Sequence, residues 1–309
     1  YLETGTGHQW MAQKIAKDKY FATGNQGRLQ AFEVNNPDML GSKNLIEFAV
    51  EKGLYNPDKD GAFNFSKAYT RDDERDRDYN DPRVWIIQQQ FNPSLKQDIA
   101  DGRNFAPFLT PEKKVSVEEA KAMLRNHFEG TEHDPYTNGL NGKEPWRPIS
   151  VFRTYEAHVM QVRPELPQEI GEVTYVGLGM ADLTAFVPFY SGLEAYPKHY
   201  GVGTDKADSD SIYWKYHKLQ TLVMTDYPKL APIVKKAYQE WEAKTALEQK
   251  AMEVNYLKMA KTDKAAANKM LNKFNLDVMA SAEKLTEDLT NQLFTIRTED
   301  IQSDIFFAN

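Results

Sequence analysis

The alternation of apolar and polar positions predicts β-strands near the start of the chain. In residues 1–34, β-prone segments flank the charged stretch 16–19, and this arrangement predicts a hairpin. The segment 24–27, Gly-Asn-Gln-Gly, follows the second predicted strand. Its two glycines permit unusual backbone angles or the close approach of a ligand.

A second group of strands is predicted in the middle of the chain. Residues 149–162 form the longest strand-like run, and both of its faces carry apolar side chains, as in a strand that is covered on both sides. Two more strands are expected near residues 172–178 and 183–189. Their short connection favours antiparallel neighbours.

Helical signals occupy the rest of the chain. Ser42 is expected to cap a short helix that Gly53 ends, and Ser116 begins a capping box that opens a helix through Phe128. After residue 205 the apolar spacing becomes that of helices. The last three predicted helices run from Asp208 or Ser209 to Met224, from Pro228 to about residue 260, and along a stripe that comprises Leu271, Phe274, Val278, Leu285 and Leu289.

Strands in blocks followed by helices in blocks predict a layered α+β fold. We expect one incomplete domain over residues 1–309. Its predicted parts are strands in 1–34, a helical and loop insertion in 35–148, strands in 149–200 and long helices in 205–300.

Composition narrows the classes of function. Hydrophobic residues make up 41% of the chain, which is enough for a packed core. The net charge of -7 disfavours nucleic acid as a partner, and no stretch reaches the roughly 18 apolar residues of a membrane span. The charged run 71–78 alternates in sign, so we expect a solvated surface segment.

The chain contains no cysteine, so neither a disulfide nor a thiolate can reside in it. It begins at Tyr1, and residues 2–4 have the character of strand interior. We therefore expect the fold to begin before this sequence.

Several unusual strings occur in a specific order. They are Gly-His-Gln-Trp-Met-Ala at 7–12, Gly-Asn-Gln-Gly-Arg at 24–28, Arg-Pro-Ile-Ser-Val-Phe-Arg-Thr-Tyr-Glu-Ala-His at 147–158, Gln-Val-Arg-Pro-Glu-Leu-Pro at 161–167 and Val-Pro-Phe-Tyr at 187–190. In this order the chain resembles the dipeptidase A family of cysteine peptidases, which are N-terminal-nucleophile hydrolases. The resemblance covers roughly residues 1–240.

The resemblance implies a fold and a mechanism. The fold would be part of a four-layer αββα sandwich with antiparallel sheets, followed by the long C-terminal helices. An N-terminal cysteine would supply the thiolate, and its own α-amino group would act as the base. Because this chain has no cysteine, we expect the nucleophile in a missing N-terminal segment, and we expect the chain alone to be inactive.

Two residues are candidates for catalysis. Asn25 matches the position at which related hydrolases place an asparagine whose NH2 group donates to the oxyanion; the alternative is an ordinary turn residue. Arg153 is expected in the middle of a strand, where a charge needs a partner. The resemblance makes it the arginine that lowers the pKa of the thiol, with Arg147 as the fallback; the alternative is a structural salt bridge.

Four residues are candidates for substrate binding. Gln26 belongs to the same string as Asn25. Glu156 is expected to hold the ammonium group of a dipeptide, and His8 or His158 its carboxylate. The alternative for Glu156 and His158, which share one face of the predicted strand, is a buried hydrogen bond between them.

The expected partners are a dipeptide substrate, the missing N-terminal segment that carries the cysteine, and further copies in a homo-oligomer. We expect no cofactor, no metal ion, no nucleic acid and no membrane contact. The lack of disulfides makes the cytoplasm the expected location. Two other functions remain open, namely a related amidase of the bile-salt hydrolase or penicillin acylase type, and a non-catalytic binding protein on the same fold.

Overall fold

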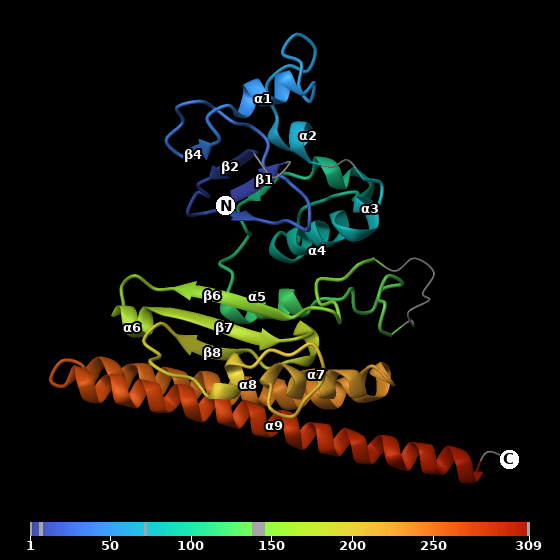
Figure 1. Cartoon of the computed structure of the whole chain (residues 1–309), viewed down its shortest axis with the longest axis vertical. Helices are drawn as coiled ribbons and strands as arrows, with labels where there is room; N and C mark the ends of the chain where they lie inside the picture. The colour runs from blue at the N-terminus through green and yellow to red at the C-terminus, as the bar shows by residue number, and fades with distance from the viewer. Residues whose placement is uncertain (1, 6–8, 71–72, 138–145, 308–309) are drawn as a thin grey trace. The chain divides into compact units, whose positions relative to one another are not determined.

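The computed structural model describes residues 2–5, 9–70, 73–137 and 146–307, with elements labelled in Figure 1. Two compact units divide the chain. The first comprises Tyr1–Val115 and Gly130–Pro148, and the second comprises Ser116–Glu129 and Ile149–Asn309. The single domain expected from the sequence stays a prediction.

The first unit combines short strands with short helices. Strands β1, β2 and β4 form one antiparallel sheet in the order β1-β2-β4, and β3 pairs with β5 in another. The elements are β1 (Leu2–Gly5), β2 (Gln9–Gln13), β3 (Tyr20–Phe21), β4 (Met39–Gly41), α1 (Leu45–Glu51), α2 (Phe65–Tyr69), α3 (Asp76–Tyr79), α4 (Asp81–Phe91), the 3-10 helix η1 (Ile99–Asn104) and β5 (Phe108–Leu109).

The hairpin predicted around residues 16–19 is wrong. A turn does form there, since Lys19 donates its backbone N–H to the carbonyl of Ala16. The strands on either side nevertheless pair elsewhere: β2 pairs with β1 and β4, and β3 pairs with β5. Pairing with distant segments therefore overrides the local turn signal.

The predicted helix α1 is present, but Asn44 rather than Ser42 precedes it. Ser42 instead accepts a hydrogen bond from the backbone N–H of Trp10 through its Oγ. One face of α1 joins the core of this unit. That core consists of Met11, Leu29, Leu45, Ala49, Phe63, Phe65 and Ala68.

The second unit contains a three-stranded antiparallel sheet and the longest helices. The sheet order is β6-β7-β8, and β7 and β8 are antiparallel neighbours, as their short connection predicted. The elements are α5 (Val117–Arg125), β6 (Glu156–Val162), α6 (Gln168–Gly171), β7 (Glu172–Leu178), the 3-10 helix η2 (Ala181–Leu183), β8 (Val187–Tyr190), the 3-10 helix η3 (Lys198–Gly201), α7 (Ile212–Val223), α8 (Tyr227–Met259) and α9 (Lys264–Phe307).

The predicted strand over residues 149–162 begins seven residues later, at Glu156. Local turns use the backbone groups before that point: Val151 donates its N–H to the carbonyl of Ile149, and Thr154 donates to that of Val151. Ser150 is fully buried and accepts a hydrogen bond from the backbone N–H of Asp182. These contacts hold residues 149–155 in turns.

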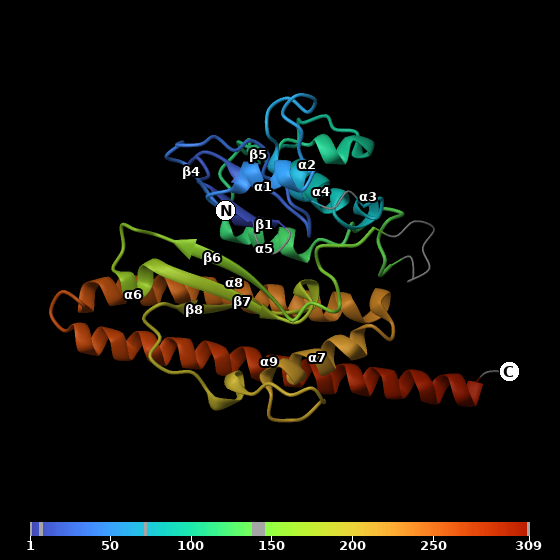
Figure 2. The ribbon, with the colours of Figure 1, turned by 45° about the horizontal axis from the view of Figure 1, so that its top comes forward.

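Helices α8 and α9 run side by side beneath one face of this sheet (Figure 2). The capping box at Ser116 and the helix start next to Pro228 are confirmed. The second half of α8 exposes the apolar side chains of Leu247 and Val254. Its buried face carries Thr245, Gln249, Met252 and Tyr256. Gln249 donates to the Tyr175 hydroxyl, and the Tyr256 hydroxyl donates to Asn268.

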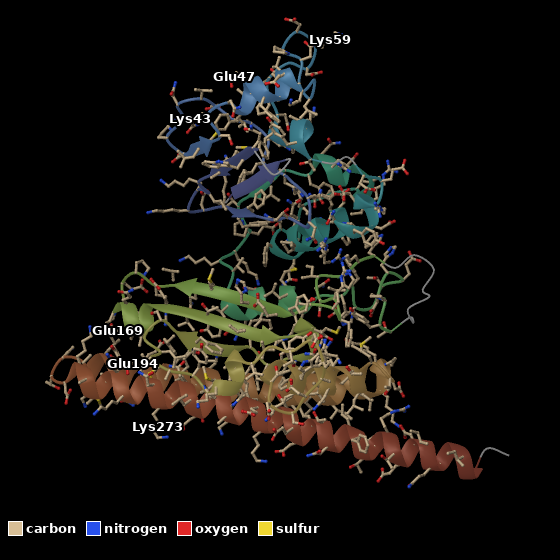
Figure 3. The ribbon with its side chains drawn as sticks, in the orientation of Figure 1. Lys43, Glu47, Lys59, Glu169, Glu194 and Lys273 are labelled. Atoms are coloured by element: carbon tan, nitrogen blue, oxygen red, sulfur yellow. The ribbon has the colours of Figure 1, made fainter. Side chains whose placement is uncertain are left out.

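The structure confirms the predicted α+β class with long C-terminal helices. Figure 3 shows charged side chains of the second unit, such as Lys273 on α9, and Glu169 pairs with Lys264 at 2.5 Å. None of the helices in the described ranges is long and apolar enough to cross a membrane.

Candidate functional site

The loop of residues 24–27 lies against the junction between α3 and α4. A Cβ on Gly24 would lie 2.7 Å from Oδ1 and 3.1 Å from Cα of Asn80, so only glycine fits this approach. The backbone N–H of Asn25 donates to Asn80 Oδ1 at 2.8 Å. Thr23 Oγ1 donates to the carbonyls of Gly24 and Gln26. The loop is therefore fixed from both sides.

The side-chain amide of Asn25 accepts a hydrogen bond through its oxygen, whereas its NH2 group is open to a ligand. Arg83 Nη2 donates to Asn25 Oδ1 at 2.9 Å and to Asn80 Oδ1 at 2.5 Å. The NH2 group of Asn25 donates to no residue in the described part of the chain. Because Arg83 fixes the orientation of the amide, its two N–H donors are available to a ligand.

Two buried carboxylates lie beneath this loop. Asp76 accepts from Asn80 Nδ2 at 2.5 Å and from Arg103 Nη2 at 3.0 Å, and Asp81 accepts from Gln26 Nε2 at 3.0 Å. Burial raises the pKa of the Asp81 carboxyl, although the Gln26 hydrogen bond and the charge of Arg103 oppose this shift.

This arrangement corrects the view of the charged segment as wholly solvated. Asp76, within the run 71–78, is only 6% exposed, and Asp81, three residues beyond the run, is only 2% exposed. Sequence reasoning missed both residues, because alternating charge is typical of solvated surface. Their partners Arg103 and Gln26 lie far away in the sequence, so no local spacing could have revealed the pairs.

A cavity of about 420 Å³ opens beside the loop, within the first unit. Its lining includes Asn25 and Gln26, together with Arg147, the fallback for the active-site arginine. The guanidinium of Arg147 lies 5.9 Å from the centre of the Tyr79 ring. The cavity thus combines amide donors with charged groups of both signs, since Asp76 and Arg75 also line it, and this combination suits a polar ligand.

Arg153 belongs to the second unit and lies in the turn before β6, with an exposed side chain. The argument that a buried mid-strand charge needs a partner is therefore wrong for this residue. Among the described residues, no ion pair or hydrogen bond engages its guanidinium. A structural salt bridge, the alternative for Arg153, is absent from that same part of the chain.

Glu156 and His158 share one face of β6, as the strand period predicts. His158 Nδ1 lies 3.1 Å from Oε1 and 3.0 Å from Oε2 of Glu156. Both side chains are 46% exposed, so the pair is not the buried hydrogen bond of the alternative interpretation. His8, the other candidate for the carboxylate, lies outside the described residues.

Sequence reasoning missed a buried polar cluster in the second unit. Tyr227 donates its hydroxyl to Asp182 Oδ2, and His127 Nε2 lies 2.8 Å from the same hydroxyl oxygen. Lys235 Nζ lies 2.7 Å from Asp182 Oδ1. Burial alone would raise the pKa of the Asp182 carboxyl, but the His127 hydrogen bond and the Lys235 charge outweigh it and lower the pKa.

The same cluster includes three groups with the chemistry of metal ligands. Ligand atoms of His127, Glu129 and Asp182 all lie within 4.8 Å of one another. The hydroxyl of Tyr227 already contacts two of these groups, and the Lys235 ammonium balances the charge of Asp182. We therefore interpret the cluster as a structural network that anchors residues 149–155 through Ser150 and Asp182. Its members are scattered from 127 to 235, so no sequence motif marks them.

Comparison with known proteins agrees with the class of hydrolase that the strings suggest. The profile of peptidase family C69 matches residues 1–240. The chain therefore belongs to peptidase family C69, and the resemblance to the dipeptidase A family of cysteine peptidases is confirmed.

Curated relatives carry matching names. A "Probable dipeptidase" of Salmonella dublin is 50% identical over 67% of this chain and 46% of its own length. A "Probable dipeptidase" of Latilactobacillus sakei is 33% identical over 97% of the chain and 62% of its own length. The "Dipeptidase A" of Lactobacillus helveticus is 27% identical over 94% of the chain and 59% of its own length. The chain thus spans roughly half of each relative.

Proposed function

We propose that this chain forms part of the substrate site of a dipeptidase whose attacking cysteine thiolate lies in polypeptide outside this sequence. Membership of family C69 and the names of the relatives support a peptidase acting on dipeptides. The absence of cysteine from the sequence supports a nucleophile located elsewhere. We further propose that the sheets belong to a four-layer αββα sandwich.

The observation that carries this proposal is the side chain of Asn25. Arg83 donates to the Asn25 oxygen at 2.9 Å, and Asn25 lines the cavity with its NH2 group available to a ligand. A preorganised N–H donor of this kind stabilises the oxyanion that forms when a thiolate attacks a peptide carbonyl. Water would then release the acyl group from the thiolate and regenerate the enzyme.

Asn25→Ala tests this role in the full-length protein that contains the cysteine. Loss of one oxyanion donor should lower kcat by about 10²–10³-fold with little change in KM. Asn56→Ala, which alters an exposed asparagine in a loop of the same unit, is the matched control and should leave kcat unchanged. A kcat for Asn25→Ala within about threefold of the wild type would contradict the oxyanion role, since that role requires a far larger loss.

A panel of dipeptides, conjugated bile salts and penicillin V would test the class of substrate. We expect turnover of free dipeptides by the full-length protein and none by residues 1–309 alone. Turnover of the amide substrates in preference to dipeptides would replace the proposal with the related amidase. Turnover of none of them would favour a binding protein.

The other site residues stay predictions. Arg153 would lower the pKa of the thiol through its charge, and its exposed guanidinium, which pairs with no carboxylate among the described residues, is compatible with that role. Glu156 would hold the substrate ammonium. His158 is a weaker candidate for the carboxylate, since its Nδ1 already contacts Glu156. The cytoplasmic location and the homo-oligomer also stay predictions.

A further inference from the structure

A second cavity, of about 290 Å³, adjoins the first and belongs to the same unit. Gln26, Gly27 and Thr70 line both cavities. The loop that presents Asn25 therefore forms a common wall, and a ligand held in the second cavity would lie next to the proposed oxyanion donor.

The charges around the second cavity have one sign. Arg28, Lys67 and Arg103 line it, and its described lining contains no aspartate or glutamate. The remaining described lining residues are neutral amides, hydroxyls and a glycine. Arg103 also pairs with Asp76, but the cations of the lining outnumber its acidic groups, which makes the cavity attractive to an anion. The first cavity differs, because Asp76 accompanies its two arginines.

Two of the three cations are held in place by the fold. Arg28 is 5% exposed and donates through Nη2 to the carbonyl of Phe105 at 2.5 Å. Arg103 donates through Nη2 to Asp76 Oδ2 at 3.0 Å. Lys67, in contrast, is exposed on α2 and forms no ion pair with any carboxylate in the described ranges. Its ammonium is therefore available to a ligand.

Gln26, in the wall shared by the two cavities, favours a ligand that carries a hydrogen-bond donor. Gln26 Nε2 donates to Asp81 Oδ1 at 3.0 Å, which fixes the orientation of the amide. Gln26 Oε1 is buried and has no hydrogen-bond partner among the described atoms. A buried acceptor without a partner is unfavourable, so a ligand N–H that reaches it would be stabilising.

We propose that the second cavity binds the α-carboxylate of the substrate, with the peptide N–H donating to Gln26 Oε1. In a dipeptide the carboxylate and the peptide N–H are attached to the same Cα, so one residue satisfies both requirements. Inorganic phosphate offers the charge but not this pairing of anion and amide donor. The inference rests on the proposed dipeptidase function and identifies its carboxylate-binding side.

The test compares L-alanyl-L-alanine with L-alanyl-L-alaninamide in the full-length protein. The wild type should prefer the free carboxylate by about tenfold in kcat/KM, as expected when a charged hydrogen-bond partner is removed. Lys67→Gln should raise KM for alanyl-alanine about threefold to tenfold and leave KM for the alaninamide unchanged. Lys67→Glu should produce a larger effect in the same direction.

Lys59→Gln provides the matched control. Lys59 is an exposed lysine of the same unit, and Figure 3 shows it in the loop between α1 and α2. It does not line the second cavity, so both substrates should keep their wild-type KM values.

Two results would overturn the inference while leaving the dipeptidase function intact. One is equal kcat/KM of the wild type for the two substrates. The other is an equal change for both substrates in Lys67→Gln. Failure of the wild type to hydrolyse either substrate would instead remove the proposed function, and the inference with it.

Discussion

Tyr227→Phe should destabilise the second unit more than removal of a typical buried hydroxyl. The hydroxyl of Tyr227 donates to the Asp182 carboxylate and lies 2.8 Å from His127 Nε2. Both partners are almost completely buried, with exposures of 2% and 1%. Water therefore cannot replace the lost group.

The magnitude follows from the charge of the partner. A hydrogen bond to a charged group contributes about 1.5–3 kcal/mol, compared with about 1 kcal/mol for a neutral pair. His127 keeps a second contact, because its Nε2 lies 3.3 Å from Glu129 Oε1. The expected loss of stability therefore includes no full penalty for leaving the His127 ring nitrogen unpaired. We expect the free energy of unfolding to fall by about 2–3 kcal/mol.

Tyr238→Phe is the matched control in the same unit. Tyr238 is 2% exposed, and the hydrogen-bond partner of its hydroxyl among the described residues is the neutral hydroxyl of Thr286, at 2.8 Å. Its loss should lower the free energy of unfolding by about 1 kcal/mol. Urea unfolding followed by far-UV circular dichroism measures both values, provided that the m-values agree. A loss for Tyr227→Phe no larger than that for Tyr238→Phe would refute the charge-assisted network.

Three further predictions concern single positions. Asp182→Asn should lower stability at pH 7 by about 3–5 kcal/mol, because Lys235 loses its counter-charge. The folded-state pKa of Asp182 is depressed, so the wild-type advantage should be full above about pH 4 and vanish as pH falls through the folded pKa; a pH-independent difference in urea unfolding would contradict this. Gly24→Ala should lower kcat/KM about tenfold or more by displacing the loop, whereas Gly203→Ala, which meets nothing within 4 Å, should be silent. Glu156→Gln should raise KM for free dipeptides far more than for N-blocked ones, and equal effects would exclude it from binding the ammonium.

Features that depend on neighbours in sequence were predictable. The capping box at Ser116, the start of α8 beside Pro228 and the apolar stripe of α9 all arise within a few residues of one another, and the structure contains them. The antiparallel pair β7 and β8 followed from a short connection. The family also followed from strings that retain their order along the chain.

Features that depend on distant partners were not predictable. The start of β6 is set by turns in residues 149–155 and by Ser150, whose partner Asp182 lies 32 positions away. The buried carboxylates Asp76 and Asp81 look like solvated charges until Arg103 and Gln26 are brought to them.

The sequence by itself therefore determined the α+β class and the family, and it marked the loop that contains Asn25 as a candidate site. Only the tertiary structure decided what surrounds that loop. It formed the two cavities, placed three cations in the lining of the second, and buried Gln26 Oε1 without a hydrogen-bond partner among the described residues. The physical reason is that helix caps and strand periods are local interactions, whereas the burial of a charge depends on groups that only folding brings together.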